Sequence, residues 1–552
     1  MSGADETPVL IVGGGPVGLA LAADLGRRGI ECTLVEQSDG TIYHPRANTV
    51  NSRTMEFCRR WGIAEEVRQA GTPPDFPLDI VFCTGLHGYL LARVERPTYG
   101  GHKPLPTTPE RSQRCNQLFF DPIMRKLAAS FASVRLRYRC RFESFTETSD
   151  GVDCQVHDLA SDRHETIKAR FLVACCAGRS SVPQALGIRW EGQPVLSYHL
   201  NVFLKIKELW DRHDKGKTAF YFFVDEAGLG PSLIELDGNE LWRFGFSTGQ
   251  KLIAPEDVDF PALIEKFMGP DIPYELISVL PWTCRSIVAD TWRRGKVFLA
   301  GDAVHQHSPS GGFGMNTGVG DAVDLAWKLA AALAGWSGPA LLESYGIERK
   351  PVASRIVREA TEGQAPLADA STLAFVRAAN ADGDRARRLI GDEILRERTK
   401  VFVSDGLVLG YRYEPSPIIV PDGTPPPAES VSRYMPTARP GSRAPHAWLD
   451  GGRSTLDLFG DGFVLLAFDG AADHAPPIVA AARSRGVPIK LYAIGDPAIA
   501  ALYERRLVLV RPDGHVCWRA DAPPEDPLPL VDCVRGQARS NLQVASTGPM
   551  PI

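Results

Sequence analysis

The chain has 552 residues, of which 44% are hydrophobic and 23% are charged, and its formal net charge is −5. This length exceeds what one hydrophobic core supports, so about two to four domains are expected. The weakly acidic balance, without a long basic run, argues against binding to nucleic acid or to a membrane surface. No apolar run approaches the roughly 18 residues of a membrane span, and the acidic start lacks the basic region of a signal peptide.

The eleven cysteines are scattered along the chain without a Cys-x-x-Cys pair. This pattern is typical of buried free thiols in an intracellular protein, and it predicts neither a disulfide framework nor a metal site. We therefore expect a cytoplasmic protein without a structural metal.

A β-α-β unit is predicted at the start of the chain, with strands over 8–12 and 32–35 and a helix over 17–28. Its turn reads Gly13-x-Gly15-x-x-Gly18. These glycines permit the tight turn, the approach of a pyrophosphate and close helix–strand packing. A carboxylate at Glu36, where the second strand ends, would accept from ribose hydroxyls. The unit predicts a dinucleotide site without distinguishing NAD from FAD, and its candidate residues are Gly13, Gly15, Pro16, Gly18, Glu36 and Gln37.

The middle of the chain is predicted to be rich in strands. An insertion over 76–105 has weak strand patterns, a helix is expected over 121–131, and strands are expected across 134–156 and 166–175. From 197 to 245 the hydrophobic period is close to two, with aromatic side chains on one side, which predicts an antiparallel sheet. This sheet is the best candidate to cover a substrate.

A second motif follows about 280 residues after the first. An apolar strand leads into Gly301-Asp302, and Pro309 then opens a segment that contains Gly311, Gly312 and Gly314 and ends at Asn316. Backbone amides aimed at one point would stabilise an anionic acceptor such as a reduced flavin. The alternative is a glycine-rich loop that only caps the next helix. Together with the first motif, the segment favours FAD.

The last third of the chain is predicted to contain helices over 321–333, 341–362 and 377–400. A proline-rich linker is expected over 413–445. Strands over 463–468, 488–492 and 507–510, with helices between them, predict a small terminal α/β domain.

Over about residues 8–360 the chain resembles the group A flavin-dependent aromatic hydroxylases, which have the para-hydroxybenzoate hydroxylase fold. The residues that carry the resemblance are Gly13 to Gly18, Glu36, Pro45-Arg46-Ala47, Arg53-Thr54-Met55-Glu56, Gln117, Arg179-Ser180, Gly301-Asp302, Pro309 to Asn316, Asp321-Ala322 and Glu348-Arg349-Lys350-Pro351.

The resemblance implies an α/β protein with a Rossmann-type FAD-binding domain over 1–75, 106–190 and 281–365. A mixed β-sheet substrate domain, over 76–105 and 191–280, would be inserted in it. Residues 366–412 would form a helical connection and 413–445 the linker. Residues 446–552 resemble the thioredoxin-like domain of the longer, phenol-hydroxylase-like members. Since this domain lacks Cys-x-x-Cys, we expect it to serve packing or a homodimer contact rather than thiol exchange.

The resemblance also implies roles for single residues. Arg46 and Gln117 would contact the phosphate and ribityl region of FAD, and Asp302 would hold the ribityl chain. The isoalloxazine would be framed by Pro309, Gly312, Gly314, Met315 and Asn316. In the implied reaction NADH or NADPH reduces the flavin, O2 adds to give a C4a-hydroperoxide, and the terminal oxygen passes to a phenolic ring. The implied partners are a small phenolic substrate and O2.

The family pattern fails in one segment. An Asp-Gly pair is expected shortly before Arg179, in a segment that the family uses for both FAD and NAD(P)H, and this chain has Cys176-Ala177 there. Pro183 also replaces a usual arginine. Reduction by a nicotinamide is therefore expected to be weakened or arranged differently.

Catalytic candidates come from the expected need for a base near the phenol. Phenol-hydroxylase-like members often have an aspartate where this chain has Asn48, which cannot act as a carboxylate base. Tyr221 could polarise the phenol, although a packed strand tyrosine is the alternative. His305 and His307 are further candidates, unless they are hydrogen-bonded structural histidines. With Pro309 at the flavin, the catalytic candidates are Tyr221, His305 and Pro309, and an acidic phenol would need less help from a base.

Other functions stay open. The same flavin chemistry could give Baeyer–Villiger or epoxidising oxygenation of a polyketide-like substrate. A flavin-binding protein without NAD(P)H turnover would follow if the departure at Cys176-Ala177 abolishes reduction. A simple NAD-dependent dehydrogenase is disfavoured because it leaves the segment from Asp302 to Asn316 unexplained.

Overall fold

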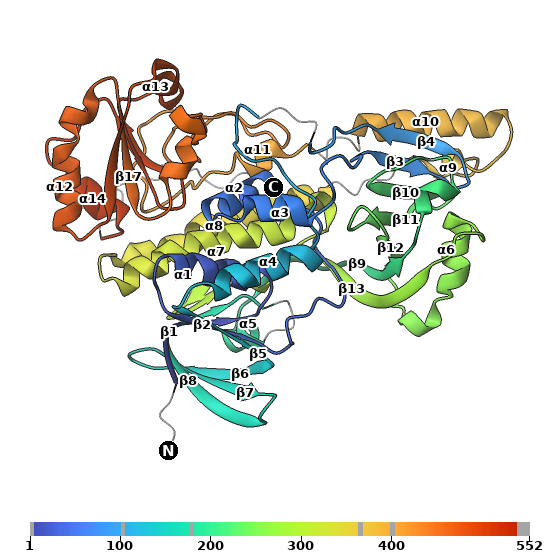
Figure 1. Cartoon of the computed structure of the whole chain (residues 1–552), viewed down its shortest axis with the longest axis horizontal. Helices are drawn as coiled ribbons and strands as arrows, with labels where there is room; N and C mark the ends of the chain where they lie inside the picture. The colour runs from blue at the N-terminus through green and yellow to red at the C-terminus, as the bar shows by residue number, and fades with distance from the viewer. Residues whose placement is uncertain (1–4, 101–104, 177–180, 363–367, 398–402, 538–552) are drawn as a thin grey trace, which may run out of the picture. The chain divides into compact units, whose positions relative to one another are not determined.

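The computed structural model describes residues 5–100, 105–176, 181–362, 368–397 and 403–537 (Figure 1). The chain forms two compact units. Unit 1 comprises residues 1–323, 350–409 and 429–434, and unit 2 comprises residues 324–349, 410–428 and 435–552. Among the described helices, none combines the length and the apolar character that crossing a bilayer requires.

The first sheet of unit 1 has a parallel core in the order β15-β8-β1-β2-β5. Its register aligns Val12 at the end of β1 with Val35 of β2 and Ala174 of β8, and Ala174 aligns in turn with Leu299 of β15. The carboxyl ends of these strands therefore lie along one edge. The strands are β1 (Asp5–Val12), β2 (Cys32–Glu36), β5 (Val134–Tyr138), β8 (Arg163–Ala174) and β15 (Val297–Leu299), extended by β14 (Arg293–Arg294), β6 (Cys140–Glu147) and β7 (Val152–Asp158).

The carboxyl-terminal halves of the central strands are buried, with Leu10, Ile11, Leu172 and Val173 fully buried, as parallel strands covered on both faces require. Helix α1 (Pro16–Arg27) packs against α4 (Gln117–Ala129). Helix α4 begins four residues before the predicted start because Asn116 caps it, with its side chain accepting from Leu118 N–H at 2.9 Å. The short helices of this unit are α2 (Ser52–Arg60), α3 (Ala64–Ala70), α5 (Ser181–Ala185) and α11 (Asp405–Val408).

The second sheet of unit 1 has the order β16-β13-β9-β12-β11-β10-β3-β4. All neighbours are antiparallel except β10 and β3, which are parallel. The alternation over 197–245 predicted β9 to β12, and the insertion predicted β3 and β4. The strands are β3 (Ile80–Cys83), β4 (Leu90–Val94), β9 (Trp190–Lys205), β10 (Phe220–Asp225), β11 (Gly228–Glu235), β12 (Leu241–Gly249), β13 (Glu275–Ala289) and β16 (His305–Gln306).

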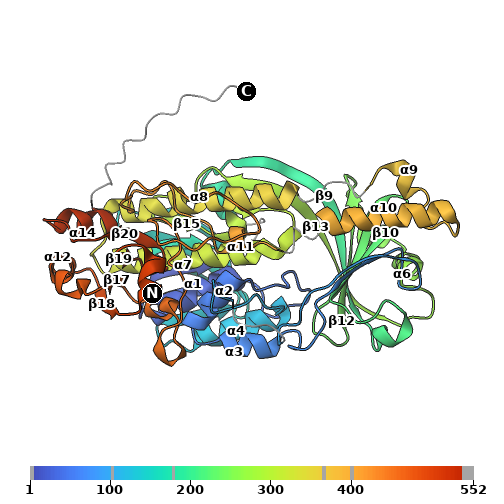
Figure 2. The same cartoon turned by 90° about the horizontal axis from the view of Figure 1, so that it is seen from above.

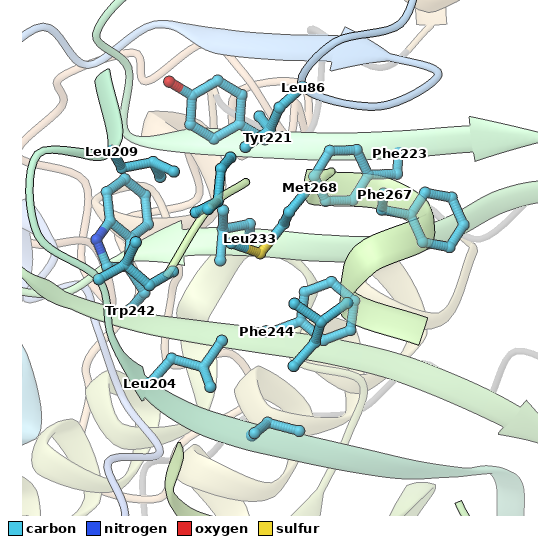
Figure 3. Close-up of a cluster of buried hydrophobic side chains, with 14 of the residues drawn as sticks. Leu86, Leu204, Leu209, Tyr221, Phe223, Leu233, Trp242, Phe244, Phe267 and Met268 are labelled. Atoms are coloured by element: carbon cyan, nitrogen blue, oxygen red, sulfur yellow. The ribbon is translucent and has the colours of Figure 1, made fainter. Parts of the chain in front are cut away.

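Helix α6 (Phe260–Met268) covers one face of this sheet (Figure 3). Phe267 and Met268 of the helix pack with Tyr221, Phe223 and other buried side chains of the strands. Near β3 and β4, a second cluster joins the sheet to α9 (Ala370–Leu373) and α10 (Ala381–Glu397), and both views show α10 beside this end of the sheet (Figures 1 and 2).

Unit 2 contains a four-stranded sheet in the order β18-β17-β19-β20, with β17 and β18 parallel and the other pairs antiparallel. Its elements are β17 (Phe463–Phe468), β18 (Ile489–Ile494), β19 (Leu507–Val510), β20 (Val516–Ala520), α12 (Pro476–Ser484), α13 (Pro497–Tyr503) and α14 (Leu528–Val534), with parts of α7 (Phe313–Leu333) and α8 (Pro339–Glu362). The predicted fold class is confirmed: α/β, with a dinucleotide-binding sheet, an inserted mixed sheet and a terminal α/β domain.

The segment 413–445, predicted as a linker, contains no helix or strand but is bonded to the terminal domain. Val420 N–H donates to Cys517 O at 2.9 Å, and Asp422 forms an ion pair with Arg519 at 2.6 Å. Most of the segment belongs to unit 2.

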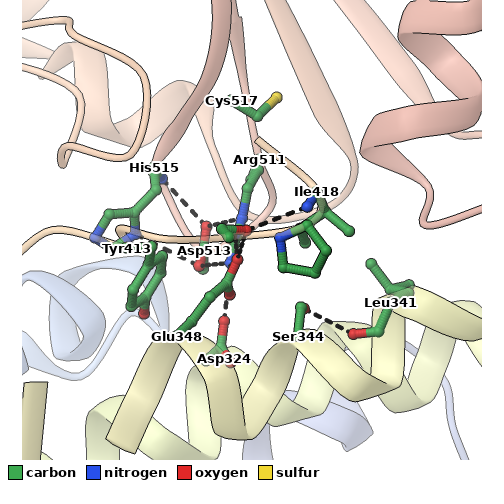
Figure 4. Close-up of polar contacts among 12 residues, drawn as sticks. Asp324, Leu341, Ser344, Glu348, Tyr413, Ile418, Arg511, Asp513, His515 and Cys517 are labelled. Atoms are coloured by element: carbon green, nitrogen blue, oxygen red, sulfur yellow. Dashed lines mark hydrogen bonds and ion pairs between the residues drawn. The ribbon is translucent and has the colours of Figure 1, made fainter. Parts of the chain in front are cut away.

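A buried ion network lies within unit 2 (Figure 4). Arg511, with no exposed side-chain surface, contacts Asp324 at 2.9 Å, Glu348 at 2.6 Å and Asp513 at 2.7 Å. Lys328 adds contacts to Asp324 and Glu348. Burial alone would raise the pKa of Glu348, but the charges of Arg511 and Lys328 outweigh it and lower the pKa. The network joins the sheet of unit 2 to its helical part.

Candidate cofactor site

The glycine turn has the geometry that a pyrophosphate requires. A Cβ on Gly18 would lie 2.0 Å from Gly13 O, and a Cβ on Gly13 would lie 3.0 Å from the backbone of Cys175 and Cys176. A Cβ on Gly15 would meet no atom within 4 Å. Gly13 and Gly18 are therefore needed for packing, whereas Gly15 leaves open space at the N-terminus of α1, which Pro16 begins.

Glu36 lies beside this turn. Its carboxylate accepts from Gly14 N–H and from Ser38 N–H, both at 2.8 Å. These bonds fix the side chain and leave further lone pairs on the two oxygens for ribose hydroxyls. The neighbouring Gln37 is exposed.

The second motif meets the first at the edge of the sheet. Gly301, which follows β15 with a φ of +62°, would place a Cβ 3.0 Å from Val17 of α1. A Cβ on Gly318 of α7 would lie 2.5 Å from the same valine and 3.1 Å from Gly301 Cα. Two segments far apart in the sequence thus pack together through glycines, as the sequence predicts for one shared site.

Asp302 follows Gly301 and is exposed. Neighbouring protein atoms partly shield its carboxyl group from water, and this desolvation raises the pKa of Asp302. The charges of His305 and Arg46 act in the opposite direction. Arg46 is also exposed, and its backbone N–H donates to Gln117 Oε1 at 3.1 Å. The residues predicted for the ribityl and phosphate region, Arg46, Gln117 and Asp302, therefore lie in one neighbourhood.

Asn316 fixes the glycine-rich segment. Its Nδ2 donates to Thr49 O at 2.9 Å and to Gly312 O at 2.7 Å, and its Oδ1 accepts from Asn51 N–H at 2.9 Å. Gly311 and Gly312 have φ values of +78° and +66°, which favour glycine. Gly314 and Met315 are half-buried, and Pro309 is exposed. Helix α7 starts at Phe313, eight residues before the predicted start, so Asn316 lies in its first turn.

The histidines of this segment have different surroundings. His305 is buried, and its Nε2 lies 2.8 Å from Asp321 Oδ2, which also accepts from Gly301 N–H at 3.1 Å. His307 Nδ1 lies 2.6 Å from Ser308 O, and burial lowers its pKa to about 4. His305 thus has the partners of a structural histidine that holds the Gly301 turn.

Tyr221 lies in the hydrophobic cluster between the second sheet and α6 (Figure 3). Its hydroxyl donates to Gly216 O at 2.6 Å, and burial raises its pKa. This is the environment of a packed strand tyrosine.

Sequence reasoning missed Thr49, Asn51 and Asp321 as supports of the site. Asp321 is among the residues that carry the family resemblance, but no local pattern indicates its bond to Gly301 or the bonds of residues 49–51 to Asn316. The departure at Cys176-Ala177 falls only partly on the described residues: Cys176 is half-buried, whereas Ala177, Arg179 and Ser180 lie outside the described part of the chain.

The donor set fits FAD. An open helix N-terminus at Gly15, carboxylates at Glu36 and Asp302, and a loop of glycine amides held by Asn316 suit a pyrophosphate, a ribose, a ribityl chain and an electron-accepting ring in turn.

Comparisons with known proteins agree with this assignment. The family model described as an FAD binding domain matches residues 6–360, and the model described as the C-terminal domain of aromatic-ring hydroxylases matches residues 437–535.

Individual relatives match along nearly the whole chain. Tetracenomycin B2 monooxygenase-dioxygenase from Streptomyces olivaceus is 35% identical, over 96% of this chain and 98% of that protein. The 4-methyl-5-nitrocatechol 5-monooxygenase of a Burkholderia species is 32% identical, over 96% and 97%. The solved structure of the rebeccamycin biosynthetic enzyme RebC with reduced flavin has a TM-score of 0.89 at 38% identity, covering 97% of this chain and all of that one. This chain belongs to the FAD-dependent aromatic-ring hydroxylases and is a flavin monooxygenase.

Proposed function

We propose that the protein uses NADH or NADPH and O2 to hydroxylate a phenolic aromatic ring. The observation that carries the proposal is the packing of the Gly301 turn and of Gly318 in α7 against Val17 of α1, which brings the two glycine motifs together at one edge of the first sheet. The names of relatives, a nitrocatechol monooxygenase and a tetracenomycin monooxygenase-dioxygenase, support an aromatic substrate.

The chain's own residues bind and orient. The N-terminus of α1 would hold the pyrophosphate, Glu36 the ribose, and Arg46, Gln117 and Asp302 the ribityl and phosphate region. The amides of the segment from Gly312 to Asn316 would stabilise negative charge on the ring. When bound, the flavin supplies the electrons and the activation of O2 that no side chain provides.

The described candidates leave the phenol without a carboxylate base. Asn48 is held between Asn116 Nδ2, at 3.2 Å from its Oδ1, and Glu235 O, at 3.5 Å from its Nδ2. Tyr221 already donates to a carbonyl group. We therefore propose that the substrate is an acidic phenol, which reaches its reactive phenolate form without a strong base. Faster turnover of plain phenols with high pKa values would contradict this.

A second candidate is oxygenation of a polyketide-like substrate of several rings, by ring hydroxylation or by an epoxidising or Baeyer–Villiger route. The similarity to tetracenomycin B2 monooxygenase-dioxygenase favours it. Product structure separates the routes, because hydroxylation preserves the carbon skeleton and Baeyer–Villiger reaction inserts oxygen between two carbons.

Anaerobic stopped-flow spectroscopy tests the proposal. The holoenzyme is mixed with NADH or NADPH, with and without phenols and multi-ring phenols. Rapid loss of the oxidised flavin band that depends on one phenol supports a substrate-gated hydroxylase. No reduction by either nucleotide under any condition would contradict NAD(P)H use, and it would point to the replacement at Cys176 and Ala177 as the cause.

A further inference from the structure

Arg243 lies on the face of the second sheet opposite α6. On β12 it is flanked by Trp242 and Phe244, which are buried in the cluster against α6. Because strand side chains alternate, Arg243 points to the other face. It pairs in register with Phe203 of β9 and Ile234 of β11. Its neighbours in register on the two adjacent strands are therefore apolar.

The charge of Arg243 has no partner among the residues that the structure describes. No carboxylate there lies within 4.0 Å of it, and its Nε is buried without an acceptor. Burial, with a contribution from Arg114, lowers its pKa to about 10, so it remains a cation at neutral pH. A cation in such surroundings is costly unless an anion pairs with it.

Arg114 shows how this protein treats another buried arginine nearby. Its Nε lies 2.6 Å from Glu235 Oε1, and its Nη2 donates to Glu235 O at 2.7 Å. Glu235 is itself held by Thr72 and by Gly238 N–H. Glu235 is therefore bonded to Arg114 and forms no ion pair with Arg243.

His44 supplies an acceptor close to this cation. Its Nδ1 lies 3.0 Å from Ser278 Oγ, and that hydroxyl donates to Tyr43 O at 3.3 Å. This arrangement assigns the proton to Nδ1 and leaves a lone pair on Nε2. His44 Nε2 is buried and has no partner in the described part of the chain. Burial and the charges of Arg243 and Arg46 lower the pKa of His44 to about 4, so the ring is neutral.

The same segment connects this sheet face to the cofactor site. The ring of His44 contacts Phe203, with centroids 6.2 Å apart, and seven residues later Asn51 N–H donates to Asn316. Residues 44–51 therefore connect this face of the second sheet to the segment that Asn316 holds in the cofactor site.

We propose that Arg243 binds an anionic oxygen of the aromatic substrate and that His44 Nε2 accepts a hydrogen bond from a hydroxyl group on the same molecule. The substrate class is an aromatic acid, with either a ring carboxylate or a phenol that ionises near neutral pH. The guanidinium group suits both because it offers several N–H donors in one plane. This inference rests on the proposed function, since it places the ligand in the pocket of that reaction.

Ligand binding to the holoenzyme tests the inference without turnover. Binding is followed by the change in flavin absorbance and fluorescence. One arm compares 3-hydroxy-2-naphthoate with its neutral amide, and the other compares 4-nitrocatechol with catechol at pH 8. In at least one of the two comparisons, the acidic ligand should bind at least about tenfold more tightly than the neutral ligand. The comparison that shows this difference identifies the anion as a carboxylate or a phenolate.

Variants assign the effect to Arg243. Arg243→Gln should bring the ratio of affinities to about one, and Arg243→Lys should retain part of it because a point charge replaces the planar fork. Lys205→Gln removes a cation from the same sheet that already pairs with Glu240 at 2.8 Å, so the ratio should persist. FAD content and the ligand-free melting temperature of Arg243→Gln should not fall, since an unpaired charge is lost.

A ratio near one in both arms of the wild-type protein, or a ratio unchanged in Arg243→Gln, overturns the inference. If the enzyme transfers oxygen to neutral phenols but the ratio of affinities is near one in both comparisons, only this inference would be overturned. An Arg243-dependent ratio without oxygen transfer to any ligand would instead overturn the proposed function.

Discussion

Gly15 and Gly18 lie three residues apart in one turn but serve different purposes. The space in front of Gly15 is open, whereas a Cβ on Gly18 would lie 2.0 Å from Gly13 O. Gly15→Ala should leave the apoprotein within about 0.5 kcal/mol of wild type and weaken FAD binding by roughly tenfold. Thermal melting of the apoprotein and FAD titration measure the two effects.

Gly18→Ala is the matched variant. It should destabilise the apoprotein by about 1–3 kcal/mol, because overpacking outweighs the gain in helix propensity. Equal effects of the two substitutions on the apoprotein would show that the turn does not separate packing from ligand approach.

Asp121, which lies in the cofactor region, makes the stability of the folded protein depend on pH. Burial raises its pKa to about 7, against a hydrogen bond from Gln117 and the charge of Arg125. The folded state thus retains a proton that the unfolded state loses above about pH 4, so stability falls as pH rises from about 4 to 7. Asp121→Asn should stabilise the apoprotein at pH 8, by on the order of 1–3 kcal/mol, and should do so less at pH 5. Melting curves at both pH values test this, and a gain that is larger at pH 5 would contradict it.

At the scale of elements, Asp321 links α7 to the turn after β15. It accepts from Gly301 N–H and contacts His305, and all three residues are buried. Asp321→Ala would leave both groups without this acceptor, at a cost of about 1–3 kcal/mol, and should weaken FAD binding because Asp302 loses its support. The exposed Asp382→Ala is the control for melting temperature and FAD affinity. Unchanged FAD affinity in Asp321→Ala would show that the turn is held by other contacts.

Helices and strands could be predicted where the local sequence has a clear hydrophobic pattern. The strands beside the glycine turn and around Tyr221 were predicted correctly. Burial of a strand on both faces leaves a continuous hydrophobic run, and burial on one face leaves an alternation of hydrophobic and polar residues. Strand β13 was missed because Pro281 and Arg285 interrupt its pattern, although it pairs along most of β9. Helix α6, a short helix with Asp259 as its cap, was also missed.

Within the site, the structure brings the predicted motif residues together, whereas the sequence did not indicate the residues that support them. The motif residues share a spacing that reflects the shape of a dinucleotide, and the structure brings them together. The bonds of Asn316 to residues 49–51 join parts of the chain about 265 residues apart. That Arg243 has no ion-pair partner among the described residues can be seen only in the structure. Neither leaves a local pattern.

At the scale of the whole molecule, the Arg511 network decides the stability of unit 2. Arg511→Gln would leave the carboxylates of Asp324, Glu348 and Asp513 with too little compensating charge, and breaking such a buried set costs about 3–5 kcal/mol. Arg505→Gln breaks an exposed pair with Asp521 at 3.7 Å and should cost about 0–1 kcal/mol. Denaturant unfolding compares the two variants. Similar losses of stability would contradict the structural role of the network.

The central claim is that the protein transfers one atom of O2 to an aromatic ring. The direct measurement is mass spectrometry of the product formed by the holoenzyme with NAD(P)H, a phenolic acid and 18O2, with a parallel reaction in 18O-labelled water. The account predicts a product that carries one 18O atom from O2 on an intact ring and none from water. NAD(P)H consumption without labelled product, or label that comes from water, would contradict it.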